Sequence, residues 1–268
     1  MNKIYLSTGA FTGRVNGRDP YLVLNHWQKL RCDGFEFMIF PEFTANLNAL
    51  LREYKASGIS FPVLHTEKDI GSLFGAQSDF DFRRSLELIK QNLFVASELG
   101  AKKAVLHLWG REDSDKFAEK IYDRAEILYN ETLPYGIDVL VENIFCVYQN
   151  PLLHLEKMHE RCPKLGFIFD TRPAQFHGQL DKSLQSPIWQ NVRHIHINDY
   201  NGGYLEWGKI NPITRPPHGN VDWNLFFSHL KRTGYQESIT LEAPAHIPDG
   251  VDDKTLNEML DFIRNNLI

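Results

Sequence analysis

The chain has 268 residues, of which 43% are hydrophobic and 24% are charged, and its formal net charge is −5 at pH 7. This is an ordinary globular composition, and a chain of this length buries a sizeable core without disulfides or a structural metal. The acidic balance gives no overall attraction to nucleic acid or to an anionic membrane, so neither is an expected partner.

Cysteine usage and hydropathy indicate the compartment. The three cysteines are odd in number and form no CxxC pair, which favours a reducing environment. A strand-like run from Ile4 to Leu6 follows Met1 almost directly, so we expect no signal peptide. We also find no apolar stretch long enough to span a bilayer. A soluble, cytoplasmic protein is therefore expected.

Short apolar runs recur along the whole chain, roughly every 25 to 45 residues, and each is followed by a longer helical pattern. Most runs are rich in Val, Ile, Leu and Phe, which is typical of parallel strands buried on both faces. The predicted strands cover residues 4–9, 34–40, 61–67, 104–110, 138–145, 166–170, 192–199 and 238–244.

The intervening segments have the apolar spacing of amphipathic helices. The clearest is the last, where apolar residues follow the i, i+3, i+4, i+7 pattern from Leu256 to Leu267 and an aspartate just before them caps the first turn. Another helix is predicted to end at Gly100, and a third to begin after Asp222. Weaker helical patterns cover residues 20–30 and 47–54.

Eight strand–helix units without a linker or a break in composition predict one α/β domain over residues 1–268, a (β/α)8 TIM barrel. A doubly wound open sheet is the alternative. Against it, the first strand is not followed by the GxGxxG spacing of dinucleotide-binding folds, and the chain has no Walker loop and no GxSxG motif.

Residues with chemical function gather at the predicted strand ends. The carboxyl ends of the strands of such a barrel meet at one face, where active sites are built. A titratable group buried there without a partner costs roughly several kcal/mol. The strand-end positions hold Glu36, His65, Glu67, His107, Glu142, Asn143, Asp170, Arg172, His194, His196, Asp199 and Glu242.

Four of these residues come from four successive strands and are candidate metal ligands: Glu142, Asp170, His196 and Glu242. Three carboxylates and one imidazole suit a single divalent ion, with Mn²⁺ favoured, Mg²⁺ and Co²⁺ close to it, and Zn²⁺ or Fe²⁺ as further alternatives. The alternative for each residue alone is a strand-end side chain paired with a helix N-terminus or an arginine. All four together favour the metal.

Several short motifs carry a family resemblance. The segments Leu140-Val-Glu-Asn143, Phe169-Asp-Thr171, His194-Ile-His-Ile-Asn-Asp199 and Thr240-Leu-Glu242 occur at the expected strand ends, and a turn runs from Pro217 to Trp223. In this order they resemble the xylose-isomerase-like TIM-barrel superfamily. That group includes sugar isomerases, ketose 3-epimerases, inosose dehydratases and the endonuclease IV type of DNA repair enzyme.

The resemblance implies a metal-dependent isomerase or epimerase acting on a sugar or sugar phosphate. Glu142 and Glu242 would be the catalytic acid–base pair, acting on opposite faces of the substrate carbon through an enediolate intermediate. A small carbohydrate would be the partner, and a homodimer is an assembly that related barrels often form. The alternatives are an inosose-dehydratase-like enzyme, an endonuclease IV-like zinc enzyme and a metal-free sugar-binding relative.

Further residues are predicted to contact the substrate. His107 is expected to orient a substrate hydroxyl, and His65 lies at the preceding strand end. Trp109 would supply an apolar wall. Arg172 and Arg215 would meet an anionic group such as phosphate, against the alternative of two solvated loop arginines.

The chain departs from the family pattern after the sixth strand. Relatives carry Asp-x-x-His there, whereas Pro173 takes the place of the histidine. His177 either fills the role from a longer loop or, the reading we favour, is a surface residue. His218 is a further uncertain site residue. The loop over residues 201–220 exceeds the usual barrel connection and is predicted to cover the substrate.

Overall fold

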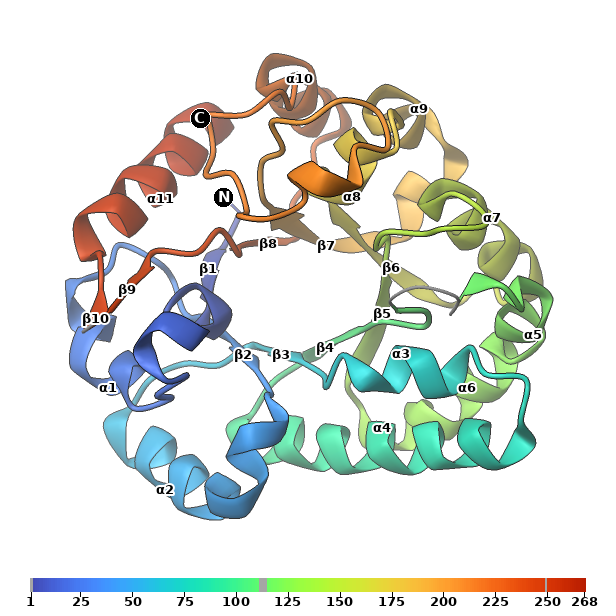
Figure 1. The fold of residues 1–268 in the computed structure, drawn as a ribbon, viewed down its shortest axis with the longest axis horizontal. Coiled ribbons are helices and arrows are strands. Elements are labelled where there is room, and N and C mark those ends of the chain that lie inside the picture. Colours follow the sequence, from blue (N-terminus) through green and yellow to red (C-terminus); the bar gives the residue numbers. More distant parts are fainter. Residues whose placement is uncertain (1, 111–114, 249) are drawn as a thin grey trace.

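A computed structural model describes residues 2–110, 115–248 and 250–268. Within these ranges, eight parallel strands pair in sequence order, and β8 pairs back with β1 to close a barrel (Figure 1). The predicted TIM barrel is confirmed, and each strand lies in or next to a predicted apolar run. The strands are β1 (Ile4–Ser7), β2 (Phe35–Met38), β3 (Val63–His65), β4 (Lys103–Leu106), β5 (Asp138–Glu142), β6 (Gly166–Asp170), β7 (Val192–Ile197) and β8 (Ser238–Leu241).

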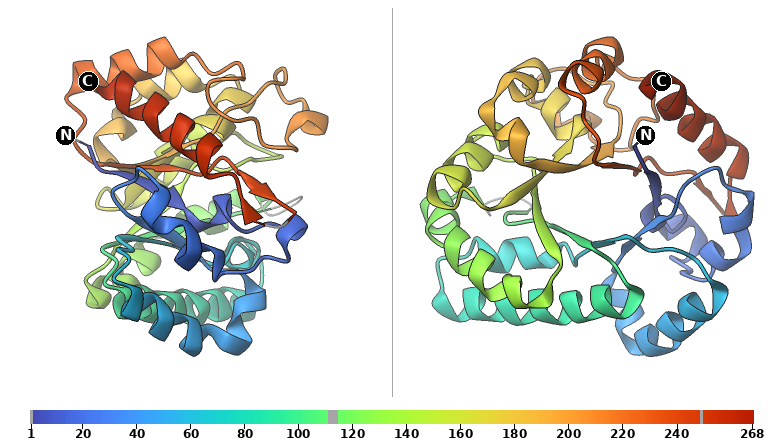
Figure 2. Two further views of the ribbon diagram at one scale, coloured as in Figure 1. Left: turned by 90° about the vertical axis from the view of Figure 1, so that its left-hand side faces the viewer. Right: turned by 180° about the vertical axis from the view of Figure 1, so that it is seen from behind.

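Helices surround the strands on the outside, as the views from the side and from behind show (Figure 2). Several shorter 3-10 turns and a two-stranded ribbon of β9 (His246–Ile247) and β10 (Gly250–Val251) complete the described elements. The α-helices are α1 (Leu22–His26), α2 (Leu47–Ser57), α3 (Asp69–Phe74), α4 (Asp79–Leu99), α5 (Ala118–Asp123), α6 (Ala125–Thr132), α7 (Pro151–Arg161), α8 (Thr171–Phe176), α9 (Leu180–Gln185), α10 (Trp223–Thr233) and α11 (Asp253–Leu267).

Local signals explain where the predicted helices begin and end. The Asp222 side chain accepts from the Leu225 amide at the start of α10, and Asp252 does the same for Thr255 at the start of α11. Gly100 ends α4 with a φ of +75°, a conformation that glycine adopts without a Cβ clash. The helix expected over residues 20–30 is shorter, because α1 passes into a 3-10 turn at Trp27.

Side-chain alternation along the strands produces two apolar layers. Residues two apart point to the same side of a strand. Outward-facing residues such as Leu64 and Ile195 pack in the main core with the helices. A second, smaller cluster is separate from this core, and we assign it to the interior of the barrel: Val63, Val105, Leu140 and Ile168.

The same alternation carries polar side chains into the barrel one step further along. Glu142 follows Leu140 by two residues, and Asp170 follows Ile168. Strand pairing then aligns Asp170 with His196 on β7. The polar layer therefore lies at the carboxyl end of the apolar layer, where the sequence predicted it.

Two further predictions concern the environment of the chain. The three cysteines are free thiols, and two of them are buried. Among the residues that the structure describes, no helix combines the length and the apolar character needed to cross a membrane.

Candidate metal centre

The four predicted metal ligands converge. Glu142, Asp170, His196 and Glu242 each offer one ligand atom, and these atoms lie within 4.8 Å of one another. The His196 side chain is fully buried, and the side chains of Glu142 and Glu242 are 3% and 13% exposed. The four strand ends therefore form one centre, as the sequence argument required.

Glu142 is held by histidines on both of its carboxylate oxygens. Oε1 lies 2.9 Å from His196 Nδ1, and Oε2 lies 2.6 Å from His107 Nε2. His65 approaches Oε2 more distantly, with its Nε2 at 3.8 Å. The carboxylate is thus fixed in orientation at the middle of the cluster.

An amide that the sequence argument missed bridges two of the ligands. Asn198 Nδ2 donates to Asp170 Oδ2 and to Glu242 Oε2, each at 3.2 Å. The sequence did contain a signal for this residue, because Asn198 follows His196 by two residues and residues two apart on a strand point to the same side. On the other side of the site, the Asn143 side chain accepts from the Asp170 amide at 2.5 Å and donates to its carbonyl at 2.9 Å. Both amides fix the strand end that carries Asp170.

The cluster carries strong electrostatic conflict. Burial, and then the charges of Glu142 and Glu242, raise the pKa of Asp170 to about 8. Burial also raises the pKa of Glu242. The charge of His196 opposes this rise, and the charge of Glu142 adds to it. Burial disfavours the charged form of Glu142, but the charges of His196 and His107 outweigh this effect and lower its pKa.

His196 carries the compensating charge. Burial lowers the pKa of an imidazole, yet Glu242, Glu36 and Glu142 together raise the pKa of His196 well above its usual value. Oε1 of Glu242 is buried and has no hydrogen-bond partner among the described residues. Crowded carboxylates, a proton held between them and a buried oxygen without a partner all fit a divalent cation, which would replace that proton.

Residues 26–266 match the family model described as Xylose isomerase-like TIM barrel. The chain belongs to this family. A ketose 3-epimerase from Arthrobacter globiformis is 25% identical over 268 residues, an alignment that covers 89% of this chain and 82% of that protein.

Solved structures share the fold. A 3-keto-D-glucoside 4-epimerase from E. coli superposes with a TM-score of 0.72 at 17% identity, covering 99% of this chain and 100% of that one. A D-allulose 3-epimerase from Methylomonas sp., solved with D-allulose, has a TM-score of 0.75 at 13% identity, covering 99% and 97%.

This member of the xylose isomerase-like family has a second group of ligand atoms beside the first. His65, His107 and Glu142 also lie within 4.8 Å of one another. Burial, with the charge of His107 adding to it, lowers the pKa of His65 to about 3, so this imidazole is neutral. Its Nδ1–H donates to the Thr66 carbonyl at 2.9 Å, which leaves Nε2 as an acceptor on the side of Glu142.

Arg172 is buried, at 8% exposure, so its interpretation as a solvated loop arginine is wrong. Its guanidinium lies 5.0 Å from the centre of the Phe145 ring and donates to the Ile210 carbonyl, while Nε has no partner among the described residues. Arg215 is partly buried, and its Nε donates to the Pro244 carbonyl at 2.9 Å.

Three other predicted site residues have different surroundings. Trp109 is fully buried and packs against His154 in a tilted arrangement, with ring centres 4.4 Å apart, so it packs within the protein. His177 is 6% exposed and accepts from the Cys146 amide at 3.2 Å, so the surface reading of this residue is wrong. His218 is exposed on the long loop.

Asp199 anchors the turn that precedes α10. Its carboxylate accepts from the amides of Gly219 and Val221, at 2.9 and 3.2 Å, and from the Trp223 indole at 3.0 Å. A Cβ on Gly219 would lie 2.2 Å from Asp199 Oδ1, so only glycine fits there. The strand-end carboxylate of Asp199 therefore has a structural role and takes no part in the metal cluster.

The long loop over residues 201–220 is tied to the carboxyl-end face of the barrel. Leu205 donates its amide to the Phe176 carbonyl at 3.0 Å, and Asp199 forms an isolated bridge with Thr214. Trp207 packs against Phe176 with ring centres 4.8 Å apart. These contacts place the loop next to α8 (Figure 1), which begins directly after Asp170.

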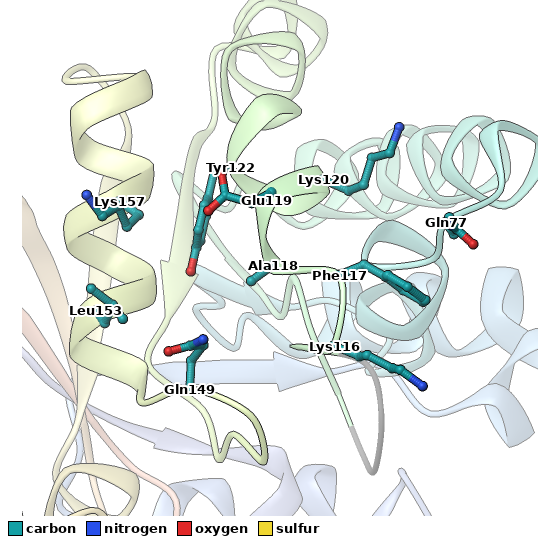
Figure 3. Close-up of a pocket in the computed structure, with 10 residues that line it drawn as sticks. All are labelled: Gln77, Lys116, Phe117, Ala118, Glu119, Lys120, Tyr122, Gln149, Leu153 and Lys157. Atoms are coloured by element: carbon teal, nitrogen blue, oxygen red, sulfur yellow. The ribbon is translucent and has the colours of Figure 1, made fainter.

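A separate surface pocket of about 400 Å³ lies beside α5 and α7, and Lys116, Lys120 and Lys157 contribute to its wall (Figure 3). None of the residues at the metal cluster lines it. Lys157 is paired with Glu160 at 2.8 Å. The pocket is therefore distinct from the metal centre.

Proposed function

We propose that this chain is a divalent-metal-dependent epimerase or isomerase of a ketose or ketose phosphate. The observation that carries the proposal is the convergence of Glu142 and Glu242 with Asp170 and His196 in one buried cluster. Such a site would supply the positive charge of a bound cation, and its two glutamates would supply a pair of bases. The family membership and the ketose 3-epimerase relative support the choice of substrate.

The cation would be held by Glu142, Asp170, His196 and Glu242. When bound, a divalent ion polarises a carbonyl and stabilises the negative charge that develops when a neighbouring carbon loses its proton. Mn²⁺ suits three carboxylates and one imidazole, and Mg²⁺ or Co²⁺ are the nearest substitutes.

Glu142 and Glu242 would transfer the proton. One carboxylate removes it from the carbon next to the carbonyl, and the other returns a proton to the opposite face, which inverts that carbon. The environments of the two differ, since the pKa of Glu242 is raised while that of Glu142 is lowered. Glu242 is thus the more basic of the pair, and its side chain is the more exposed, 13% against 3%.

His107 and Arg172 would hold the substrate. The His107 side chain is 11% exposed, and its Nε2 is bonded to Glu142. A substrate hydroxyl that contacts His107 would therefore lie next to the Glu142 carboxylate. Arg172 has an Nε–H without a partner in the described part of the chain, and this donor suits an oxygen of the substrate. His65 and Arg215 are the remaining proposed contacts.

The experiment is a screen of free and phosphorylated ketoses with the purified protein, with Mn²⁺ or with a chelator, followed by chromatography of the products. We expect a new epimer or isomer only when the metal is present. A product that has lost water would indicate a polyol dehydratase instead. Conversion that persists in the chelator would overturn the proposed role of the cation.

The second candidate is an endonuclease IV-like zinc enzyme, favoured by the extra ligand group of His65, His107 and Glu142. The missing Asp-x-x-His leaves such a multi-zinc site short of ligands, because Pro173 replaces the histidine. Metal analysis separates the two. About one ion per chain supports sugar chemistry, and about three, the number of the repair-type cluster, supports DNA repair.

A further inference from the structure

Glu36 contacts His196 at the ring nitrogen opposite the one that faces Glu142. Its carboxylate is fully buried, and Oε2 lies 3.1 Å from His196 Nε2. The other ring nitrogen, Nδ1, lies 2.9 Å from Glu142 Oε1 and 3.5 Å from Glu242 Oε2. The imidazole therefore bridges Glu36 and the cluster, one nitrogen to each.

A run of hydrogen bonds through the barrel interior ends on Glu36. Lys103 Nζ donates to Ser238 Oγ at 3.2 Å, and Ser238 Oγ lies 2.7 Å from His194 Nδ1. His194 Nε2 lies 2.8 Å from Thr240 Oγ1 and 3.3 Å from Glu36 Oε2. The Thr240 hydroxyl donates to Glu36 Oε2 at 3.0 Å, so this carboxylate oxygen is an acceptor.

Glu36 is the final acceptor of that run of hydrogen bonds, and an ionised carboxylate has no proton to give. His196 must therefore present an N–H at Nε2. A neutral imidazole with its proton on Nε2 has its lone pair on Nδ1, and Nδ1 faces the carboxylates of Glu142 and Glu242. Buried carboxylates that accept from the second nitrogen of a metal-binding histidine fix its tautomer and raise its basicity.

We propose that Glu36 is a positioning residue that holds the proton of His196 on Nε2 and so makes Nδ1 the nitrogen that binds the cation. The inference rests on the proposed function only for the presence of the cation. Glu36 could instead be a ligand of a second ion, since it also groups with His65 and Glu242. The orientation of its bonded oxygen toward His196 and Thr240 favours positioning.

The test measures metal binding alone, so it is separate from the test of catalysis. Co²⁺ is titrated into metal-free wild type, Glu36→Gln and Glu67→Gln, and visible absorption reports its affinity and coordination. Glu67 is the matched control, because it is a strand-end carboxylate bonded to Asn92 at 2.9 Å and not to the cluster. We expect Glu36→Gln to lose about 10–100-fold in affinity and Glu67→Gln to match wild type.

A second readout needs no variant, in case Glu36→Gln fails to fold. In the Zn²⁺-loaded wild type, nitrogen-15 NMR of the histidines shows which nitrogen of His196 is protonated. The inference requires a protonated Nε2 and a metal-bound Nδ1. Binding through Nε2, unchanged Co²⁺ affinity in a folded Glu36→Gln, or loss of a second ion only, each overturns it. Wild type that binds no Co²⁺ also overturns the proposed metal site, whereas the other outcomes leave that site standing.

Discussion

Glu142 Oε2 and His107 Nε2 are 2.6 Å apart, a contact that joins the carboxyl ends of β5 and β4. Hydrogen bonds to a charged partner are short and about twice as strong as neutral ones. Because the other oxygen of Glu142 faces His196, the carboxylate has one orientation toward the centre of the site. In the proposed reaction, a carboxylate held in this way would act as a base without first rearranging.

Replacing His107 with alanine should therefore slow the reaction without unfolding the protein. Loss of the bond leaves Glu142 less well oriented, and we expect kcat/KM for the best ketose to fall by at least about tenfold, within the range found for residues that support a site. Steady-state kinetics measures this. His26→Ala, which removes a contact with Asp253 outside the barrel, is the control. Equal activity of His107→Ala and wild type would remove His107 from the site.

Metal affinity should depend on pH through Asp170. Its pKa is raised to about 8 in the metal-free protein, so the group is largely protonated below that pH, and a cation must displace the proton. Affinity for Mn²⁺ should then rise with pH up to about 8, with proton release on binding. Calorimetry in two buffers that differ in ionisation enthalpy counts the protons. Binding with no proton release from about pH 6 to 8 would contradict this assignment.

Gly219→Ala should destabilise the fold. The added Cβ would meet Asp199 Oδ1 at 2.2 Å, and moving the carboxylate breaks its bonds to the turn before α10. We expect a loss of about 1–3 kcal/mol in the free energy of unfolding, measured in urea. Gly208→Ala is the matched control, since a Cβ there would meet no described atom within 4 Å beyond the two neighbouring residues in the chain. Similar stability of the two variants would show that the turn tolerates a side chain.

Arg172→Gln should weaken the binding of a phosphorylated ketose more than that of the free ketose. A hydrogen bond to a charged group contributes about 1.5–3 kcal/mol, so its loss should raise KM for the phosphorylated sugar by about 10–100-fold and change KM for the free sugar less. Kinetics with the matched pair of substrates gives the ratio. If both substrates are affected equally, Arg172 contributes through its packing on Phe145 and not through an anion.

Much of the site could be predicted because strand ends follow from local sequence. Glu142 and Asp170 end buried apolar runs, and closure of the barrel brings all such ends to one face. His196 follows from the same argument. The four predicted ligands therefore meet without any loop having to be predicted.

Other features depend on contacts between distant parts of the chain. Glu36 and Thr240 are 204 residues apart, so their bond follows only from closure of the barrel. The burial of Arg172 depends on where the long loop folds, and His177 is buried because the loop after β5 covers it. Loop residues have no hydrophobic periodicity, so the positions of these side chains could not be predicted from local sequence.

Incorporation of deuterium from D₂O into a ketose, measured by mass spectrometry with Mn²⁺ present, tests the proposed proton transfer. Wild type should label the carbon next to the carbonyl, while Glu142→Gln and Glu242→Gln should each abolish labelling. Near-wild-type labelling by either variant would remove that glutamate from proton transfer. Absence of labelling by metal-loaded wild type, across substrates that it converts, would contradict the acid–base mechanism itself.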